Sequence, residues 1–346
     1  MIEINQDEVT QNWLKQERFP MVSIQCMAYN HASYIAFALD GFLSQKTTFP
    51  FEIIVHDDAS TDGTADIIRV YEKKFPNIVR PIYEKENQYS KKDGSLGKII
   101  DAACSGKYIA FCEGDDFWCD SQKLQRAVVF LEKNTNYSAC THNTMLINNM
   151  TRKYEKRVMF PSEDSDLTLK DILAGVDFHT SSIVCLRDMW LNRPSFCFAQ
   201  PGVGDFPFKV FLSLNGPIKR FGDVMSVYRW GAPNSWTSKL MKCPENSIRN
   251  TINAMKMLCM ANEWSKGVSE DVFFHAISRM LYRNYLKLGQ FKIVRKEPFH
   301  TFWESESFFN KTKHFLRYLK NVRMLKNSSC LIEQLNNIYL ELNERK

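Results

Sequence analysis

The sequence predicts an α/β fold in which a mostly parallel sheet is flanked by helices and followed by a C-terminal helical region. Between about residues 20 and 135, short apolar runs alternate with polar loops and segments of helical periodicity. The runs are mostly apolar, which is typical of parallel strands covered on both faces. From about Pro244 onward, apolar residues instead recur three and four positions apart, which indicates helices.

The elements of the first part can be justified in order. Four runs have strand length and are rich in β-branched and aromatic residues: "MVSIQCMAY" (21–29), "FEIIVH" (51–56), "NIVRPIY" (77–83) and "KYIAFC" (107–112). Each is followed by a segment with helical spacing of its apolar residues: 33–45, 64–75, 96–106 and 121–134. Gly106 marks the predicted end of the third helix.

Beyond residue 137 the pattern loosens into mixed strands and short helices, at 137–148, 181–188, 204–215 and 223–230. Two long helical segments follow, at 247–264 and 271–289. Because no glycine- or serine-rich linker or repeat is present, the change of pattern alone places a boundary near residue 240. We expect one domain over 1–240, with halves at about 20–135 and 136–240, and a helical region over 241–346.

The composition is that of a globular protein, with 44% hydrophobic and 24% charged residues. A net charge of +6 suits anionic ligands but is too small to indicate a nucleic-acid partner, and we expect none. The N-terminus does not resemble a signal peptide and no run reaches membrane-spanning length, so we expect a cytoplasmic protein. The ten cysteines form no C-x-x-C pair and are expected to be reduced thiols.

Polar clusters follow three of the predicted strands. They are residues 29–31 ("YNH"), 56–63 ("HDDASTDG") and 113–116 ("EGDD"). The carboxyl ends of parallel strands meet at one edge of a sheet, where ligands of such sheets bind. We therefore expect the three clusters to lie close together around one ligand.

Adjacent carboxylates repel each other unless a cation or hydrogen-bond donors compensate their charge. Mg²⁺ and Mn²⁺ prefer oxygen ligands, often one or two carboxylates together with phosphate oxygens, so "EGDD" is a candidate metal site. A solvated turn is the alternative. In "DDASTDGT", helix capping accounts for Ser60, Thr61 and Asp62 but not for Asp57 and Asp58, which are free to bind a nucleotide base or sugar.

Phosphate-binding glycine loops are missing, since neither G-x-x-x-x-G-K-[ST] nor G-x-G-x-x-G occurs. A metal ion and basic side chains are then needed to hold phosphates. Lys91, Lys92 and Lys98 are candidates, and for each of them a solvated surface position is an equal alternative.

The segments "PMVSIQCMAYNHASYIAFALDGFLSQ", "FEIIVHDDASTDGTADII" and "GKYIAFCEGDDFWCDSQKLQRAVVFLEKN" resemble, in order and spacing, the inverting family-2 glycosyltransferases with the GT-A fold. The resemblance is strong over about 20–135 and looser over 136–230. It implies a nucleotide-sugar donor, usually UDP-linked, bound by the first half, and an acceptor bound by the second. Tyr29 would lie along the base, and Asp58, together with Asp57, would accept a hydrogen bond from the uracil ring nitrogen.

The resemblance also implies a divalent metal, Mg²⁺ or Mn²⁺, on the diphosphate. Glu113-Gly114-Asp115 stands where the family has its D-x-D motif, and Glu113 departs from the usual Asp. We therefore expect Asp115 and Asp116 to contact the ribose and the metal, with Glu113 as the second choice. Lys98 is expected to help bind the cofactor phosphates.

Inverting transfer requires a general base on the acceptor side, which family members supply as an Asp or Glu at the start of a helix. Asp205, after two glycines and before a helical run, is the candidate, and a helix N-cap is its structural alternative. His179, ahead of "SSIVCLR", would flank the sugar by resemblance, although a single histidine is more often structural.

The tail at 310–326 is basic on one helical face and apolar on the other. It could lie on an anionic membrane surface, where a lipid-linked acceptor is found, or pack on the domain, and such helices could also mediate homo-oligomerisation. The resulting hypothesis is a cytoplasmic glycosyltransferase, peripheral on the inner membrane face, that acts on a glycan or lipid-linked acceptor in polysaccharide biosynthesis. The alternatives are a non-catalytic nucleotide-sugar-binding protein and a sugar-nucleotide nucleotidyltransferase.

Overall fold

The computed structural model describes residues 5–14, 19–148, 157–158, 161–231, 244–321 and 328–344. The chain forms two compact units. Unit 1 comprises residues 1–168, 177–193 and 215–231, and unit 2 comprises residues 169–176, 194–214 and 232–346. Among the described residues, no helix is long and apolar enough to cross a membrane.

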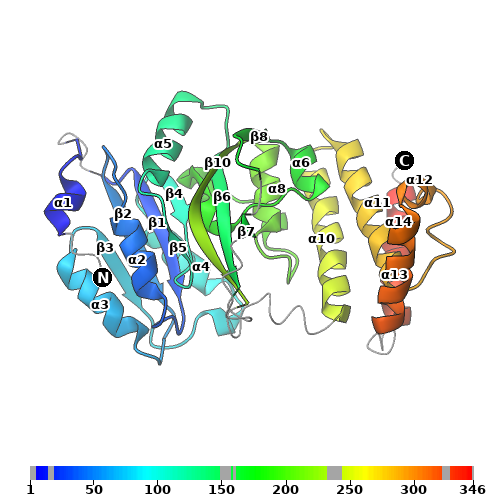
Figure 1. Ribbon diagram of the computed structural model, residues 1–346, viewed down its shortest axis with the longest axis horizontal. Coiled ribbons are helices and arrows are strands. Elements are labelled where there is room, and N and C mark those ends of the chain that lie inside the picture. Colours follow the sequence, from blue (N-terminus) through cyan, green and yellow to red (C-terminus); the bar gives the residue numbers. More distant parts are fainter. Residues whose placement is uncertain are drawn as a thin grey trace. The chain divides into compact units, whose positions relative to one another are not determined.

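Unit 1 is built on one ten-stranded sheet (Figure 1). Its strands are β1 (Val22–Ala28), β2 (Phe51–Asp57), β3 (Val79–Tyr83), β4 (Tyr108–Phe111), β5 (Phe117–Trp118), β6 (Ala139–Asn148), β7 (Arg157–Val158), β8 (Ser165–Leu167), β9 (Val184–Leu186) and β10 (Ile218–Trp230). Its helices are α1 (Gln6–Thr10), α2 (Ile35–Leu43), α3 (Thr64–Lys74), η1 (Tyr89–Lys91), α4 (Ser95–Ala103), α5 (Lys123–Lys133), η2 (Thr180–Ser182) and α7 (Arg187–Leu191).

The sheet is mixed, and its first four strands are parallel. The strand order is β3-β2-β1-β4-β9-β6-β10-β5, and β7 and β8 pair with β6 and β10. The β3-β2-β1-β4 ladder is parallel throughout, β9 runs antiparallel to both of its neighbours, and β6 and β10 are parallel to each other. The predicted α/β fold with a helix-flanked sheet is confirmed, and the sheet is mixed beyond its first four parallel strands.

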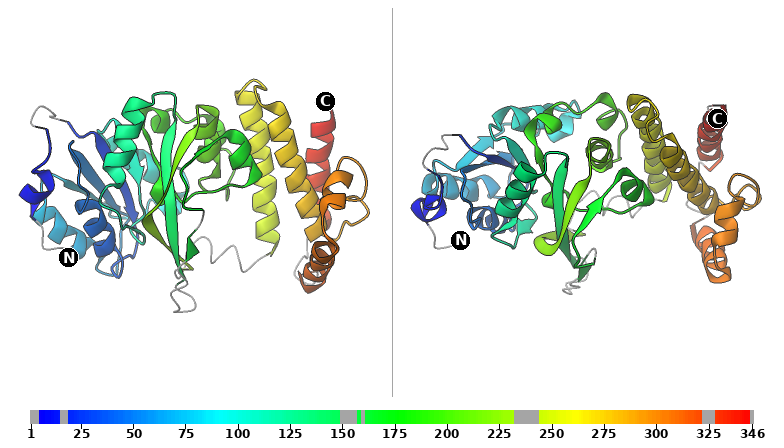
Figure 2. Two further views of the ribbon diagram at one scale, coloured as in Figure 1. Left: turned by 45° about the horizontal axis from the view of Figure 1, so that its top comes forward. Right: turned by 90° about the horizontal axis from the view of Figure 1, so that it is seen from above.

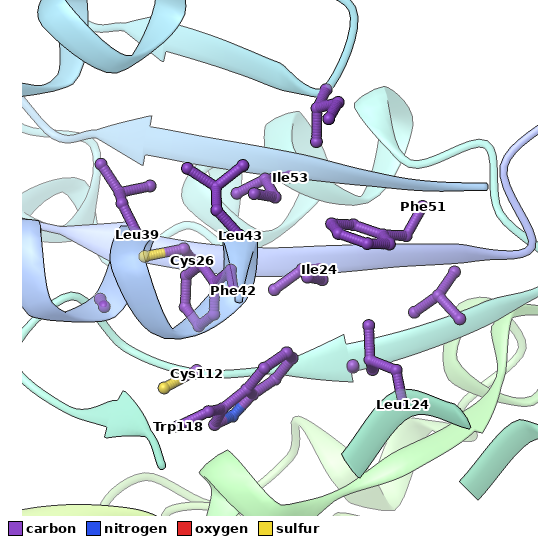
Figure 3. Packing of buried hydrophobic residues seen from close by; sticks show 14 of the residues in the cluster. Ile24, Cys26, Leu39, Phe42, Leu43, Phe51, Ile53, Cys112, Trp118 and Leu124 are labelled. Carbon is purple, nitrogen blue, oxygen red and sulfur yellow. The ribbon is translucent and has the colours of Figure 1, made fainter. Parts of the chain in front are cut away.

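The central strands are apolar because helices cover them. Every residue of β2 is buried, including the apolar run Ile53–Val55 at its centre. On one side of the sheet the ring of Phe42 from α2 packs edge-on against Trp118 at 4.7 Å, and Figure 3 shows both rings beside Ile24 and Cys112. Gly41 allows this approach, because a Cβ there would lie 2.6 Å from the carbonyl oxygen of Trp118.

A buried carboxylate, that of Glu52, joins neighbouring strands at the edge of the sheet where the parallel strands begin. Glu52 accepts hydrogen bonds from the hydroxyl of Ser23 at 2.6 Å and from the backbone N–H of Ser105 at 2.7 Å, and it pairs with Arg80. Burial alone raises the pKa of Glu52, but these hydrogen bonds outweigh burial and lower the pKa below its ordinary value. Glu52 therefore stabilises β1 and β2, whose other ends lead into the polar clusters of the sequence.

The predicted helices and strands of residues 21–134 are all present, with small differences at their ends. The largest concerns α4, which ends at Ala103 and not at Gly106, because Cys104 has extended backbone angles (φ −78°, ψ 127°). Gly106 is needed for another reason: a Cβ there would lie 2.5 Å from the backbone nitrogen of Ser23. The described cysteines are free thiols, and Cys243 lies outside the described residues.

Unit 2 is helical. It contains α6 (Leu169–Ala174), η3 (Ser195–Cys197), α8 (Phe206–Leu214), α10 (Pro244–Trp264), α11 (Glu270–Lys287), α12 (His300–Ser305), α13 (Phe308–Asn321) and α14 (Ser328–Glu344). The rings of Phe196, Phe211 and Trp264 meet edge-on at 5.7–6.4 Å and tie η3, α8 and α10 together. The helices α10 and α11 lie side by side in both views of Figure 2.

Each unit is made of several segments that are not continuous in the sequence. Residues 169–176 and 194–214, which the sequence groups with 1–240, cluster with the C-terminal helices. The predicted boundary at 240 falls in 232–243, outside the described residues, and it stays a prediction. In the predicted tail segment 310–326, α13 exposes Phe315 and Leu316, while residues 322–326 lie outside the described residues.

Candidate active site

The carboxyl edge of the parallel strands brings the first three polar clusters together. The backbone N–H of Asp58 donates to the carbonyl of Ala28 at 2.9 Å, and that of Gly114 donates to the carbonyl of Met27 at 2.9 Å. The loops after β2 and β4 are thus bound to the end of β1, as the topology requires. Within unit 1, the sequence prediction of a common edge for the three clusters agrees with the structure.

Side chains of "STDGT" bind the loop after β1. The backbone N–H of Asn30 donates to Ser60 Oγ at 2.9 Å, and Asn30 Oδ1 accepts from the N–H of Thr61 at 2.8 Å. Asp62 accepts from the N–H of Ala32 at 3.0 Å. The expectation that Ser60 and Thr61 cap the following helix is wrong, because the N-cap of α3 is Gly63. Of the three expected residues, Asp62 does bind the start of the helix, since its Oδ1 accepts from the N–H of Thr64, the first residue of α3, at 3.1 Å.

Asp57 and Asp58 are both 3% exposed but differ in their partners. The carboxylate of Asp58 accepts from the backbone N–H of Gln88 at 2.6 Å and from that of Tyr89 at 3.1 Å, so it fixes the loop after β3. Oδ1 of Asp57 is buried and has no hydrogen-bond partner among the described residues. An unsatisfied buried acceptor is costly, and it is the kind of atom that a ligand N–H satisfies.

Tyr29 follows β1 directly and is 47% exposed, so its ring is available to a ligand at this edge. Lys98 is exposed in the first turn of α4, which runs back from the carboxyl edge of β3. Lys91 pairs with Glu86 at 2.5 Å, and Lys92 is exposed in a left-handed conformation (φ 55°).

In "EGDD", the residues differ sharply in environment. Glu113 is exposed, and Gly114 is buried where a Cβ would lie 2.9 Å from both His31 Nδ1 and Ile35 Cδ1. Asp115 is partly exposed, and its Oδ1 is buried without a hydrogen-bond partner among the described residues. Glycine is therefore required at 114, and Asp115 carries an acceptor atom that is left for a ligand.

Asp116 is 1% exposed, so its carboxylate is buried. Its Oδ1 accepts from the backbone N–H of Arg229 at 2.9 Å, and its Oδ2 lies 3.7 Å from His179 Nδ1. Burial, followed by the charge of Asp115, raises the pKa of Asp116 well above its usual range.

His179 is positioned from two sides. Its ring stacks on Tyr228 with centroids 4.1 Å apart, and its Nδ1 lies 2.8 Å from Ser181 Oγ. The backbone carbonyl of Ser181 in turn accepts from Trp118 Nε1 at 2.9 Å. The structure thus brings His179 to the acidic loop, although a single histidine in a sequence is more often structural.

Arg229 is a residue of this edge that the sequence did not single out. Its guanidinium carbon lies 4.7, 5.1 and 5.3 Å from the ring centroids of Phe117, Tyr34 and Phe37, and its Nη1 is buried without a hydrogen-bond partner among the described residues. The guanidinium is therefore held by aromatic rings beside Asp116. The only sequence signal is an arginine two residues before Gly231, at the end of a strand-like run.

His31 follows β1 in the first polar cluster. Its Nδ1 is buried without a hydrogen-bond partner among the described residues. Burial lowers the pKa of His31, while the charges of Asp115, Asp62 and Asp57 oppose this shift. The imidazole therefore lies between the acidic groups that follow β2 and β4.

Asp205 belongs to unit 2, so its surroundings are those of that unit. It directly precedes α8 and follows Gly202 and Gly204, which have positive φ (76° and 61°), and its Oδ2 lies 2.9 Å from Lys209 Nζ. The side chain of Asp205 is 38% exposed. The predicted role as a base stays a prediction.

Carboxylates at the edge of unit 1 fit a hard divalent cation, since Asp115 Oδ1 is an unpartnered oxygen acceptor. Among the described residues, no group of three or more His, Cys, Asp or Glu side chains is arranged to hold a metal ion. A cation here would take one or two protein ligands and complete its shell with phosphate oxygens and water, which is the usual arrangement for Mg²⁺.

Residues 23–192 match the model of Glycosyl transferase family 2. The segment is a family-2 glycosyltransferase domain, and its sheet and helices form a GT-A-type fold. An uncharacterized protein of Mycobacterium tuberculosis is 35% identical over 224 residues, which is 63% of this chain and 61% of that protein. The chain thus spans about three fifths of the length of that relative.

Two further likenesses concern proteins with named activities or ligands. Poly(ribitol-phosphate) beta-glucosyltransferase of Bacillus spizizenii is 34% identical over 116 residues, 33% of this chain and 17% of that protein. The crystal structure of S. aureus TarS 1-349 in complex with UDP-GlcNAc superposes with a TM-score of 0.56 at 17% identity, covering 76% of this chain and 72% of that chain. The second likeness concerns the fold alone.

Proposed function

We propose that this protein transfers a sugar from a UDP-sugar to a hydroxyl group of a glycan or lipid-linked acceptor, with inversion at the anomeric carbon and with help from Mg²⁺ or Mn²⁺. The observation that carries the proposal is a pair of unpartnered carboxylate oxygens, Asp57 Oδ1 and Asp115 Oδ1, at one edge of a family-2 domain. They are acceptors that a nucleobase N–H and a cation, respectively, would satisfy.

The uracil ring would bind at the ends of β1 and β2. Asp57 accepts the imide N–H of the ring through its unpartnered Oδ1, and the exposed ring of Tyr29 lies along the base. Asp58 is the weaker choice for the base contact, since both of its oxygens already accept backbone N–H groups. Its role is to fix the loop that begins at Gln88.

The diphosphate would bind over the "EGDD" loop. Asp115, with Glu113 next to it, would hold the cation, which when bound neutralises charge on the diphosphate. Asp116 contributes less to the cation, because its carboxylate is buried and already accepts from Arg229. The unpartnered Nη1 of Arg229 donates to a diphosphate oxygen, and exposed Lys98 adds positive charge nearby.

The reaction exchanges one bond at the anomeric carbon for another. The acceptor oxygen forms a bond to this carbon from one face while the bond to the diphosphate oxygen breaks on the other, and UDP leaves with the electron pair. Asp205 takes the proton of the acceptor hydroxyl. Arg229 stabilises the negative charge that develops on UDP, which is an electrostatic contribution of the kind that is often the largest in catalysis.

The class of acceptor is inferred from the names of proteins that this chain resembles. The Bacillus spizizenii relative is named a poly(ribitol-phosphate) beta-glucosyltransferase, so its printed acceptor is a polymer. We propose a glycan or lipid-linked acceptor of polysaccharide biosynthesis on this basis. The cytoplasmic location, the membrane contact of 310–326 and a homo-oligomer stay predictions.

The test is release of UDP from a panel of UDP-sugars, with Mn²⁺ and with EDTA, in the presence of a crude glycan acceptor. We expect turnover of one donor with Mn²⁺ only, a loss of at least 100-fold in Asp115→Asn and in Asp205→Asn, and no change in Asp66→Asn. Asp66 is the matched control, since it is 81% exposed on α3. A wild type that binds a UDP-sugar without turnover would instead indicate a non-catalytic binding protein.

A further inference from the structure

Lys123, the first residue of α5, is a buried amine that the proposed mechanism does not use. Its side chain is 1% exposed, and its Nζ has no hydrogen-bond partner among the described residues. A charged amine in this environment costs much of its hydration free energy. Its retention here needs a reason other than stability.

The surroundings of the amine are one aromatic face and several weakly polar groups. Nζ lies 3.9 Å from the ring centroid of Trp118, which is the contact that compensates the charge in part. The titratable groups that interact with it are the thiols of Cys112, directly after β4, and Cys140 on β6, and the imidazole of His142 on β6. Burial lowers the pKa of Lys123 to about 7.

The indole of Trp118 connects this amine to the candidate active site. Trp118 Nε1 donates to the backbone carbonyl of Ser181 at 2.9 Å, and Ser181 Oγ lies 2.8 Å from His179 Nδ1. The same His179 nitrogen lies 3.7 Å from Asp116 Oδ2. Figure 3 shows Trp118 packed under the carboxyl edge beside Cys112. All of these residues belong to unit 1.

We propose that Lys123 is a positioning residue of this site, whose ammonium group holds the Trp118 indole on the Ser181 carbonyl and so fixes His179 beside Asp116. The proposal rests on the proposed function, because the site it orders is the sugar-transfer site. Lys123 touches no substrate and acts through Trp118. Natural proteins tolerate such locally unfavourable groups mainly at functional sites.

The first test separates a positioning role from a structural one. Lys123→Met removes the buried charge and keeps the volume, so we expect the melting temperature to rise by about 3 °C or more. In the same variant we expect kcat for UDP release to fall about 10-fold, with KM for the UDP-sugar within twofold. If Lys123 only stabilised the fold, the Lys123→Met variant would have a lower melting temperature than the wild type. Lys133→Met, at the exposed end of the same helix, is the control and should change neither quantity.

The second test does not need turnover. Protein labelled with 5-fluorotryptophan gives a ¹⁹F resonance for Trp118, assigned by its loss in Trp118→Phe. In the wild type we expect this resonance to titrate with a midpoint near pH 7, and in Lys123→Met to lie elsewhere and not titrate. Burial raises the pKa values of Cys112 and Cys140 and lowers that of His142. A titration that persists in Lys123→Met belongs to another group, such as Asp116, whose pKa burial also raises, and contradicts the assignment to Lys123.

The two tests distinguish failure of the proposal from failure of the proposed function. A wild type that releases no UDP from any UDP-sugar contradicts the proposed function, and the fluorine resonance then decides the positioning proposal by itself. An unchanged Trp118 resonance in Lys123→Met overturns the proposal in either case. So does a Lys123→Met variant with the kcat of an active wild type, or a double variant with Trp118→Phe whose loss equals the product of the two single losses.

Discussion

The backbone N–H of Arg229 donates a hydrogen bond of 2.9 Å to Oδ1 of Asp116, which ties the end of β10 to the acidic loop after β4. This bond leaves the guanidinium of Arg229 at the edge of the sheet, held against the rings of Tyr34, Phe37 and Phe117. A cation is thereby placed beside the carboxylates of Asp116 and Asp115, whose charges act on it. The arrangement suits a polyanionic ligand that also carries a metal ion.

Arg229→Lys keeps the positive charge and the backbone N–H but loses the planar guanidinium. We expect the dissociation constant of UDP in Mn²⁺, measured by isothermal titration calorimetry, to rise about 10-fold with little change in unfolding. Arg69→Lys is the control, since Arg69 lies on α3 with its guanidinium over Tyr83. Equal affinities in the Arg229→Lys variant and the wild type would remove Arg229 from the ligand site.

The neighbouring residues Asp57 and Asp58 should respond in opposite ways to the same substitution. Asp58→Asn replaces an acceptor of two backbone N–H groups and should cost about 1–2 kcal/mol of unfolding free energy in urea titrations. Asp57→Asn removes a charge without a lost intramolecular bond at Oδ1, so stability should hold while UDP affinity falls at least 10-fold. Equal losses of stability in the two variants would contradict this division of roles.

Gly114→Ala should disturb the site by steric overlap alone. Its new Cβ would lie 2.9 Å from His31 Nδ1 and from Ile35 Cδ1, so we expect a loss of about 1–3 kcal/mol in urea unfolding together with weaker UDP binding. Gly97→Ala in α4 is the matched control, because its Cβ would meet nothing within 4 Å. There the gain in helix propensity should stabilise the protein by up to about 1 kcal/mol.

Glu52 makes stability depend on pH in the acid range. A carboxyl group whose pKa is lower in the folded chain stabilises the fold above its ordinary pKa of 4.5, and this contribution is lost as the pH falls through the folded pKa. We expect Glu52→Gln to unfold at lower urea than the wild type at pH 7, with the gap closing as the pH falls below 4.5. A gap that is constant with pH would assign the loss to packing and not to ionisation.

Much of unit 1 was predictable from the sequence, because its signals are local. The mostly apolar runs of β1 and β2 indicate buried parallel strands, and parallel topology alone brings the ends of these strands, with Asp57 and Asp58, to the same edge. The family resemblance in this segment is confirmed by the match of residues 23–192.

What could not be predicted depends on contacts between distant segments. The sequence cannot tell that Asp58 accepts from Gln88 and Tyr89, or that Asp57 next to it lacks such a partner at Oδ1. Arg229 reaches the acidic loop through the β6–β10 pairing, over 100 residues after that loop in sequence. The capping expectation for Ser60 failed because Asn30, in the loop after β1, competes for its hydroxyl group.

The central claim is that the carboxyl edge of unit 1 binds a nucleoside diphosphate together with a divalent cation through Asp115. The most direct measurement is a calorimetric titration of UDP into the wild type with Mn²⁺, into the wild type with EDTA, and into Asp115→Asn and Asp66→Asn with Mn²⁺. We predict binding with Mn²⁺ in the wild type and in Asp66→Asn, and binding at least 10-fold weaker with EDTA or in Asp115→Asn. Absence of UDP binding to the wild type in Mn²⁺, or equal binding by Asp115→Asn, would contradict the account.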